Sequence, residues 1–294
     1  MKGLSRTFLL ALLTATAAAP VLGQPLATAS VSPSASAAAG DHAQFERGEP
    51  HQVIDSIGWV FGIPKKIILW DRRAVNHQVS PETEERLAAY MQTNGLATTK
   101  VRINEYDPLG EWRRLAANKE VGAGWRYTFG AFGTLGYTLF PGRLFGEDGY
   151  NPYTDTVYVY SDISCLAEEQ ASYAKIIRAH RHPGTYVAVV SLPIVQLWPE
   201  KQSKTDVLDY TLSSGTPEQN SEATRVLYAE YGAEVGGQAS MLFGAGIPLT
   251  LAGAGIGHVA AKSVDSESPA AAPSNSAELP SSEVTRLPDT TVVR

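Results

Sequence analysis

The sequence predicts an α+β fold, a small sheet with helices on both sides of its strands. Residues 99–106 and 154–160 alternate apolar and polar side chains, as strands do. Ser80 and Thr216 each precede a proline and a glutamate, a pattern typical of helix starts. Helical segments precede, separate and follow the strands without a regular alternation, so the order favours α+β over repeated strand–helix–strand units.

The first predicted helix begins after Ser80 and ends at Gly95, where a glycine lets the chain leave the helix. Leu87, Tyr90 and Met91 are three and four residues apart, so they share one face of this helix.

The next elements follow the same signals. Asp107 and Pro108 end the first strand, and a short helix is expected over residues 109–119. The helix that begins after Thr216 is expected to run to about Tyr231.

Residues 151–178 place the second strand directly before a helix. Asp162 and Ser164 supply capping side chains, and a helix-compatible run follows to about Arg178. Pro183 is expected to stop this helix.

The middle of that helix reads Glu-Glu-Gln-Ala-Ser-Tyr, and a strand that enters such a helix resembles the active-site segment of gluzincin-type zinc metallopeptidases. In that family the helix carries His-Glu-x-x-His. The two histidines bind one zinc ion, the glutamate polarises the metal-bound water, and a later helix supplies the third ligand. Both histidines are missing from this chain. The resemblance covers about residues 99–231 and implies a degenerate zincin-like core without its zinc.

Two registers align this helix with the family motif. In the first, Glu169, Gln170 and Tyr173 take the places of the first histidine, the glutamate and the second histidine. In the second, those places fall to Glu168, Glu169 and Ser172. The first fits better, because an alanine and a lysine follow Tyr173 as they follow the second histidine in some relatives.

Glu200 stands where the resemblance implies the third ligand, and Asp206 resembles a carboxylate that supports the ligands in such enzymes. The candidate residues of the vacated site are therefore Glu169, Tyr173 and Glu200. A site of carboxylates alone would suit calcium or magnesium better than zinc. Because nothing in the sequence shows that these carboxylates converge, we predict neither a bound metal nor a cofactor.

The other chemistry-bearing residues do not rebuild a catalytic motif. His180 and His182 flank the end of the helix, where a role at the helix dipole is expected. His77 is expected in a solvated loop next to the charged residues 71–73. The chain contains no Gly-x-Ser-x-Gly elbow and no glycine-rich phosphate loop followed by lysine. A glycosidase-like pair of carboxylates stays open as an alternative.

The beginning of the chain predicts export. Lys2 and Arg6 precede the apolar residues 8–13, and small residues follow up to Gly23, so cleavage is expected before Gln24. The apolar core is too short to span a bilayer. We expect the protein in the periplasm or cell envelope of a bacterium.

The domain organisation follows from composition. Residues 1–23 are the signal peptide, and residues 24–47 form a disordered linker of Ala, Ser, Pro and Thr. Residues 48–232 form the globular domain, 233–261 a glycine-rich apolar segment, and 262–294 a disordered tail.

Charge and cysteine content exclude some classes of function. The formal net charge is −6 and no basic tract occurs, so we expect no nucleic-acid partner. Cys165 is the only cysteine, which rules out an intrachain disulfide, and we expect it buried as a small apolar residue.

Two apolar segments raise the question of a membrane. Residues 235–261 carry no charged side chain over 27 residues, enough for a span, and Gly253 and Gly257 permit close helix packing. Seven glycines and Pro248 favour the alternative, a packed glycine-rich element. We slightly favour a membrane span or hairpin. Residues 125–145 are aromatic and glycine-rich, and we expect a packed loop or hairpin rather than a lipid-facing one.

Three functions stay open from the sequence. The first is a non-catalytic exported envelope protein whose pseudo-metallopeptidase domain has a binding or structural role, with a peptide or envelope protein as partner. The second is a metal-dependent hydrolase that uses Glu169, Tyr173 or Glu200 in an unconventional site. The third is a membrane-associated assembly protein that acts through its glycine-rich segment.

Overall fold

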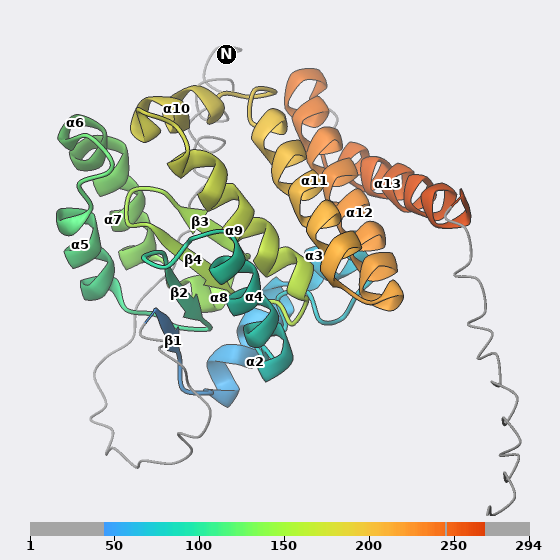
Figure 1. The fold of residues 1–294 in the computed structure, drawn as a ribbon, viewed down its shortest axis with the longest axis horizontal. Coiled ribbons are helices and arrows are strands. Elements are labelled where there is room, and N and C mark those ends of the chain that lie inside the picture. Colours follow the sequence, from blue (N-terminus) through green and yellow to red (C-terminus); the bar gives the residue numbers. More distant parts are fainter. Residues whose placement is uncertain (1–43, 245, 268–294) are drawn as a thin grey trace, which may run out of the picture.

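The computed structural model describes residues 44–244 and 246–267 (Figure 1). The predicted signal peptide and most of the predicted linker and tail lie outside the described residues. The described part is mostly helical with a small sheet, which confirms the predicted α+β class.

In the described residues the strands form one four-stranded sheet in the order β1-β2-β4-β3. Three strands are parallel, and the edge strand β3 runs antiparallel to β4: β1 (Phe45–Arg47), β2 (Lys100–Ile103), β4 (Thr156–Val159) and β3 (Gly149–Asn151). β2 and β4 lie within the two predicted strands but are shorter. Asn104 and Asp155, with φ angles of 47° and 54°, bend the chain at the end of β2 and before β4.

The two faces of the sheet differ in chemistry. Val101 and Val157, which pair across β2 and β4, lie fully buried in the main apolar core. The next pair, Arg102 and Tyr158, point to the opposite face, as successive strand residues must. There both donate hydrogen bonds to Glu111 of α5 (Pro108–Ala117), at 2.9 and 2.7 Å. One face of the sheet is therefore apolar, and the other carries a buried polar network.

The apolar face is covered by two layers of helices (Figure 1). α4 (Pro81–Thr93) and α9 (Ser164–Arg178) pack together on the sheet side, and α11 (Leu197–Ser214) and α12 (Pro217–Phe243) pack against α9. α9 is thus central: it contacts the sheet, α4, α11 and α12.

The predicted start, end and apolar face of α4 are confirmed. The Ser80 hydroxyl accepts a hydrogen bond from the Thr83 backbone N–H, and Gly95 has a φ of 67° just after the helix. Leu87, Tyr90 and Met91 are all buried in the core.

The predicted capping of α9 is wrong in detail. Its N-cap is Ile163, which offers no side-chain acceptor, and Asp162 instead supports the start of α4 beside the Ser80 cap. The Asp162 carboxylate accepts hydrogen bonds from the Ser80 backbone N–H and the Thr83 hydroxyl, both at 2.8 Å. α9 ends at Arg178 as predicted, but Pro183 begins a new helix, α10 (Pro183–Val190), rather than ending this one.

Residues 125–145 are helical, so the predicted loop or hairpin is wrong. Three short helices and one π-helical turn follow one another: α6 (Ala123–Trp125), η1 (Arg126–Gly130), α7 (Ala131–Leu139) and α8 (Gly142–Phe145). Tyr137 of α7 stacks on Tyr158 of β4, with ring centroids 5.3 Å apart, so α7 covers the polar face of the sheet beside α5. Two further helices, α2 (Gln52–Phe61) and α3 (Ile63–Leu69), complete the N-terminal half.

α12 begins with the predicted cap but continues past Tyr231 to Phe243, so the predicted helix end is wrong. The helix continues through Gly232. A glycine is needed at this position because α13 (Ile247–Glu267) packs so closely that a Cβ there would clash with the backbone of Gly253. The predicted close packing of Gly253 and Gly257 is confirmed, against α12. Among the described helices, none has the length and apolar character that a membrane crossing requires.

Candidate functional site

The three predicted site residues lie on two packed helices. Glu169 and Tyr173 are one turn apart on α9, and Glu200 is in the first turn of α11. The residue that joins these helices is Lys204, one turn after Glu200. Its ammonium group donates to Glu169 Oε1 and lies 3.6 Å from Glu200 Oε2.

Two further carboxylates reach the same ammonium group from α12. Lys204 Nζ donates to Glu234 Oε1 at 2.9 Å and lies 3.7 Å from Glu230 Oε2. A second cation, Lys65 of α3, pairs with Glu230 from the other side. We call these six residues the carboxylate cluster: Glu169, Glu200, Glu230, Glu234, Lys204 and Lys65.

The cluster is enclosed by α3, α9, α11 and α12. The Glu169 side chain is 1% exposed and the Lys204 side chain 5%, whereas Glu200 and Glu234 at the rim are each 25% exposed. Removing charges from water costs several kcal/mol per ion, so such a cluster persists only if its members compensate one another.

Within the cluster four carboxylates face two ammonium groups, and Lys65 also pairs with the exposed Glu147 at 3.4 Å. The pKa values of Glu169, Glu230 and Glu234 reflect this excess of carboxylates. Burial and the neighbouring Glu230 raise the pKa of Glu169 well above its usual range. Burial also raises the pKa of Glu234 to about 8, although Lys204 opposes this shift. At Glu230 the effect of burial is outweighed by Lys65 and Lys204, which hold its pKa well below its usual range. The two lysines thus favour the charged form of Glu230, and burial favours the protonated forms of Glu169 and Glu234.

Three buried oxygens of the cluster receive no hydrogen bond from an N–H or O–H group of the described residues: Oε2 of Glu169, of Glu230 and of Glu234. The protonation pattern accounts for the first two. The two side chains are close enough to hydrogen-bond each other, which requires a proton between them. A proton held by Glu169 satisfies both groups.

The same geometry defines which residues could hold an ion. Glu169, Glu230 and Glu234 each bring one carboxylate oxygen within 4.8 Å of the others. All three ligands are hard oxygens, which suit calcium, magnesium or manganese better than zinc. Lys204 contacts all three of these glutamates, so its ammonium group already supplies the cation at this point.

Tyr173 lies half-buried beside the cluster. Burial raises the pKa of its hydroxyl above the usual range, and the charge of Glu200 adds to the shift. A tyrosine held in its neutral form is a hydrogen-bond donor rather than a nucleophile.

The two registers proposed from the sequence share Glu169 and differ in their other residues. Glu168 of the second register pairs with Arg86 of α4, and Ser172 donates to Asp206 of α11 at 2.9 Å. Tyr173 of the first register is the residue whose hydroxyl feels the charge of Glu200. Asp206 lies apart from the cluster and accepts a hydrogen bond from Lys175 of α9 at 2.6 Å.

Sequence reasoning missed the cations and the α12 carboxylates. Glu200 with Lys204 and Glu230 with Glu234 are both spaced by four residues, which places each pair on one helix face. That spacing is the available signal. It also occurs on ordinary solvated helices, so it does not mark burial.

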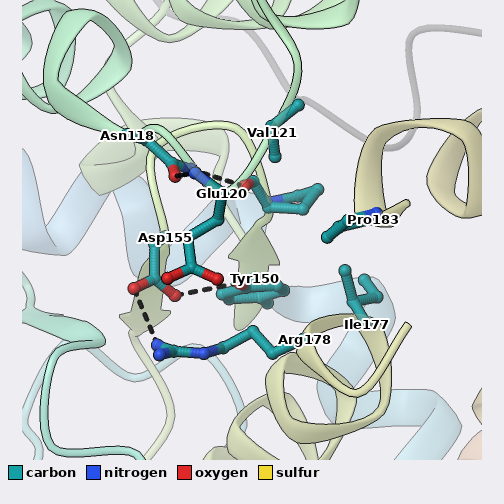
Figure 2. Close-up of a pocket in the computed structure, with 9 residues that line it drawn as sticks. Asn118, Glu120, Val121, Tyr150, Asp155, Ile177, Arg178 and Pro183 are labelled. Carbon is teal, nitrogen blue, oxygen red and sulfur yellow. Dashed lines mark hydrogen bonds and ion pairs between the residues drawn. The ribbon is translucent and has the colours of Figure 1, made fainter. Parts of the chain in front are cut away.

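Two hollows in the described part of the chain are lined by residues outside the carboxylate cluster. The first, shown in Figure 2, has a volume of about 10 Å³, room for one water molecule. In it Asp155 accepts hydrogen bonds from Arg178 and from the Tyr150 hydroxyl, both at 2.9 Å. The second, of about 380 Å³, lies between β1, β2 and α5, where Arg102 and Lys100 are paired with Glu46. In each hollow, charged residues of the lining are therefore paired with one another.

The remaining predicted candidates have structural roles. The expected solvated loop at His77 is wrong: the side chain is 4% exposed, and its Nδ1 lies 2.9 Å from Asn104 Oδ1. His180 contacts the Ile176 carbonyl at the end of α9 and stacks on Tyr186, with ring centroids 3.6 Å apart. Cys165 is buried in the core as predicted, and burial raises the pKa of its thiol.

Comparisons of the chain with protein families, with curated proteins and with solved structures find no match.

Proposed function

We propose that the chain is an exported, non-catalytic protein built on a degenerate zinc-peptidase-like core, with a binding or structural role in the bacterial envelope. The observation that carries the proposal is the position of Lys204. Its ammonium group lies among carboxylates of α9, α11 and α12. In the resembled family, the corresponding helices hold the zinc ion.

An ammonium group supplies the positive charge of a metal ion but not its chemistry. It holds Glu169 and Glu234 in place by hydrogen bonds. It has no open coordination position, so it neither lowers the pKa of a bound water to about 7 nor polarises a peptide carbonyl as zinc does. A core with Lys204 at this place keeps its helices together and loses peptide hydrolysis.

Burial supports the same conclusion. A peptide bond must approach within about 3–3.5 Å of a reacting group. Glu169, the residue that would have to act, is 1% exposed and already bonded to Lys204. Glu200 and Glu234 are more accessible, but both also contact Lys204.

The test is a cleavage assay with the full chain. The protein is incubated with a mixture of unstructured peptides, with and without added zinc, and the products are followed by mass spectrometry. The proposal predicts no cleavage under either condition. Cleavage that is abolished by a chelator and by Glu169→Gln, but kept by the exposed control Glu218→Gln, would support the hydrolase instead.

A further inference from the structure

The structure exposes large apolar side chains along one edge of the molecule. We define the apolar rim as six side chains from three segments, each more than half exposed: Phe129, Phe132, Leu192, Trp198, Phe243 and Ile247. Monomeric soluble domains rarely expose contiguous patches of this kind unless the patch meets a partner or a lipid surface.

The three segments are neighbours in space, although they are far apart in the sequence. Trp125 of α6 donates to the Thr185 hydroxyl of α10 at 3.2 Å, which joins the first segment to the second. The Ile194 backbone N–H donates to Gln238 of α12 at 3.1 Å, which joins the second to the third. In Figure 1, α6, α10 and the near ends of α11 and α12 line the upper edge of the molecule.

The charge of these segments contrasts with that of the whole chain. The chain has 30 Asp and Glu residues and a formal net charge of −6. Residues 121–146, 179–199 and 235–264 contain no Asp or Glu at all. Arg181 in the second segment and Lys201 just after it are exposed, and Glu200 beside Lys201 is 25% exposed. The three segments are therefore apolar and free of carboxylates, on a chain whose formal net charge is negative.

We infer that the apolar rim docks the protein on an anionic lipid membrane surface. Aromatic side chains such as Trp198 and Phe132 are suited to the headgroup boundary, where they bury apolar area without crossing the bilayer. Each exposed Lys or Arg near an anionic surface adds attraction, whereas carboxylates would add repulsion, so their absence from the three segments fits this partner. A protein partner would not require the three segments to lack carboxylates.

The test uses the full-length protein and vesicles of two compositions, phosphatidylcholine alone and a 3:1 mixture of phosphatidylcholine with phosphatidylglycerol. Binding is measured by sedimentation. The double variant Phe132→Ser/Trp198→Ser removes two rim side chains. The matched control is Leu109→Ser/Leu212→Ser, whose leucines are each 65% exposed but lie on α5 and at the far end of α11.

We expect binding to the mixed vesicles to exceed binding to phosphatidylcholine alone, and to fall at least about tenfold in the rim variant but not in the control. Equal binding by the rim variant and the wild type would overturn the inference, because binding would then come from another part of the chain. Failure to bind either vesicle would also overturn it. Concentration-dependent self-association that the rim variant abolishes would assign the rim to a second copy of the chain.

Discussion

Replacing Lys204 by methionine removes a buried ammonium group and keeps a side chain of similar length. In the wild type this group contacts Glu169 and Glu234 and balances part of the charge of Glu230. Removing one partner of a buried ion pair costs about 3–5 kcal/mol, because the other charge stays buried without compensation. Glu169 and Glu234 favour their protonated forms already in the wild type, so the anion that loses a cation is Glu230, which keeps its ion pair with Lys65. We therefore expect Lys204→Met to lower the free energy of unfolding by about 3 kcal/mol at pH 7.

The assay is guanidinium unfolding of the full chain, followed by tryptophan fluorescence. The matched control is Lys201→Met on the same helix, whose side chain is exposed and should change the free energy of unfolding by about 0.5 kcal/mol or less. The loss in Lys204→Met should shrink at pH 5, where the remaining glutamates take up protons more readily. A Lys204→Met protein as stable as the Lys201→Met control at pH 7 would refute the reasoning, because the ammonium group would then not compensate the buried carboxylates.

Three further predictions concern single positions. The pKa of Glu234 is about 8 in the folded state against a model-peptide value of 4.5, so the folded state binds the extra proton. Stability should therefore fall as the pH rises through this window, by up to about 1.4 kcal/mol per pH unit, and urea titrations of Glu234→Gln should show a flatter dependence between pH 6 and 8. Gly253→Leu should destabilise the α12–α13 pair by about 1–3 kcal/mol in thermal unfolding, because a side chain there meets the α12 backbone. A leucine at position 255 would point into open space, so Gly255→Leu should not destabilise the protein. Equal losses of stability in the two variants would contradict the close packing of α12 and α13. Asp162→Ala should cost about 1–2 kcal/mol in denaturant unfolding by removing the acceptor at the start of α4, and an unchanged midpoint would show that this acceptor is dispensable.

Local signals in the sequence predicted most of the central elements. The N-caps Ser80 and Thr216 mark their helices correctly, because the hydroxyl and the following proline act within one turn. Strands β2 and β4, which both precede α9, and the last residue of α9, Arg178, also follow from the sequence pattern.

Signals that depend on distant partners were misread. Asp162 supports the start of α4, 82 residues away from its partner Ser80 in sequence, and does not cap the helix that follows it. The helix after Thr216 was expected to end at about Tyr231, but α12 continues through Gly232, where the close approach of α13 leaves no room for a Cβ. The roles of Asp162 and Gly232 both depend on residues that are far away in the sequence.

The sequence singled out Glu169, Tyr173 and Glu200 but did not indicate that the carboxylates converge. Glu169 and Glu200 both contact Lys204, whose importance depends on burial. Burial of a lysine is set by the packing of α9, α11 and α12 and not by its neighbours in sequence. The contribution of Glu230 and Glu234 from α12 is a tertiary contact of the same kind.

The measurement that tests the central claim most directly is the metal content of the full-length protein. The protein is purified without chelator and analysed by elemental mass spectrometry for transition metals, calcium and magnesium. If Lys204 supplies the cation of the carboxylate cluster, the protein should be cooperatively folded with far less than one bound metal ion per chain. The account would be contradicted by about one tightly held metal ion per chain, if mutation of Glu169 also abolishes the binding of that ion.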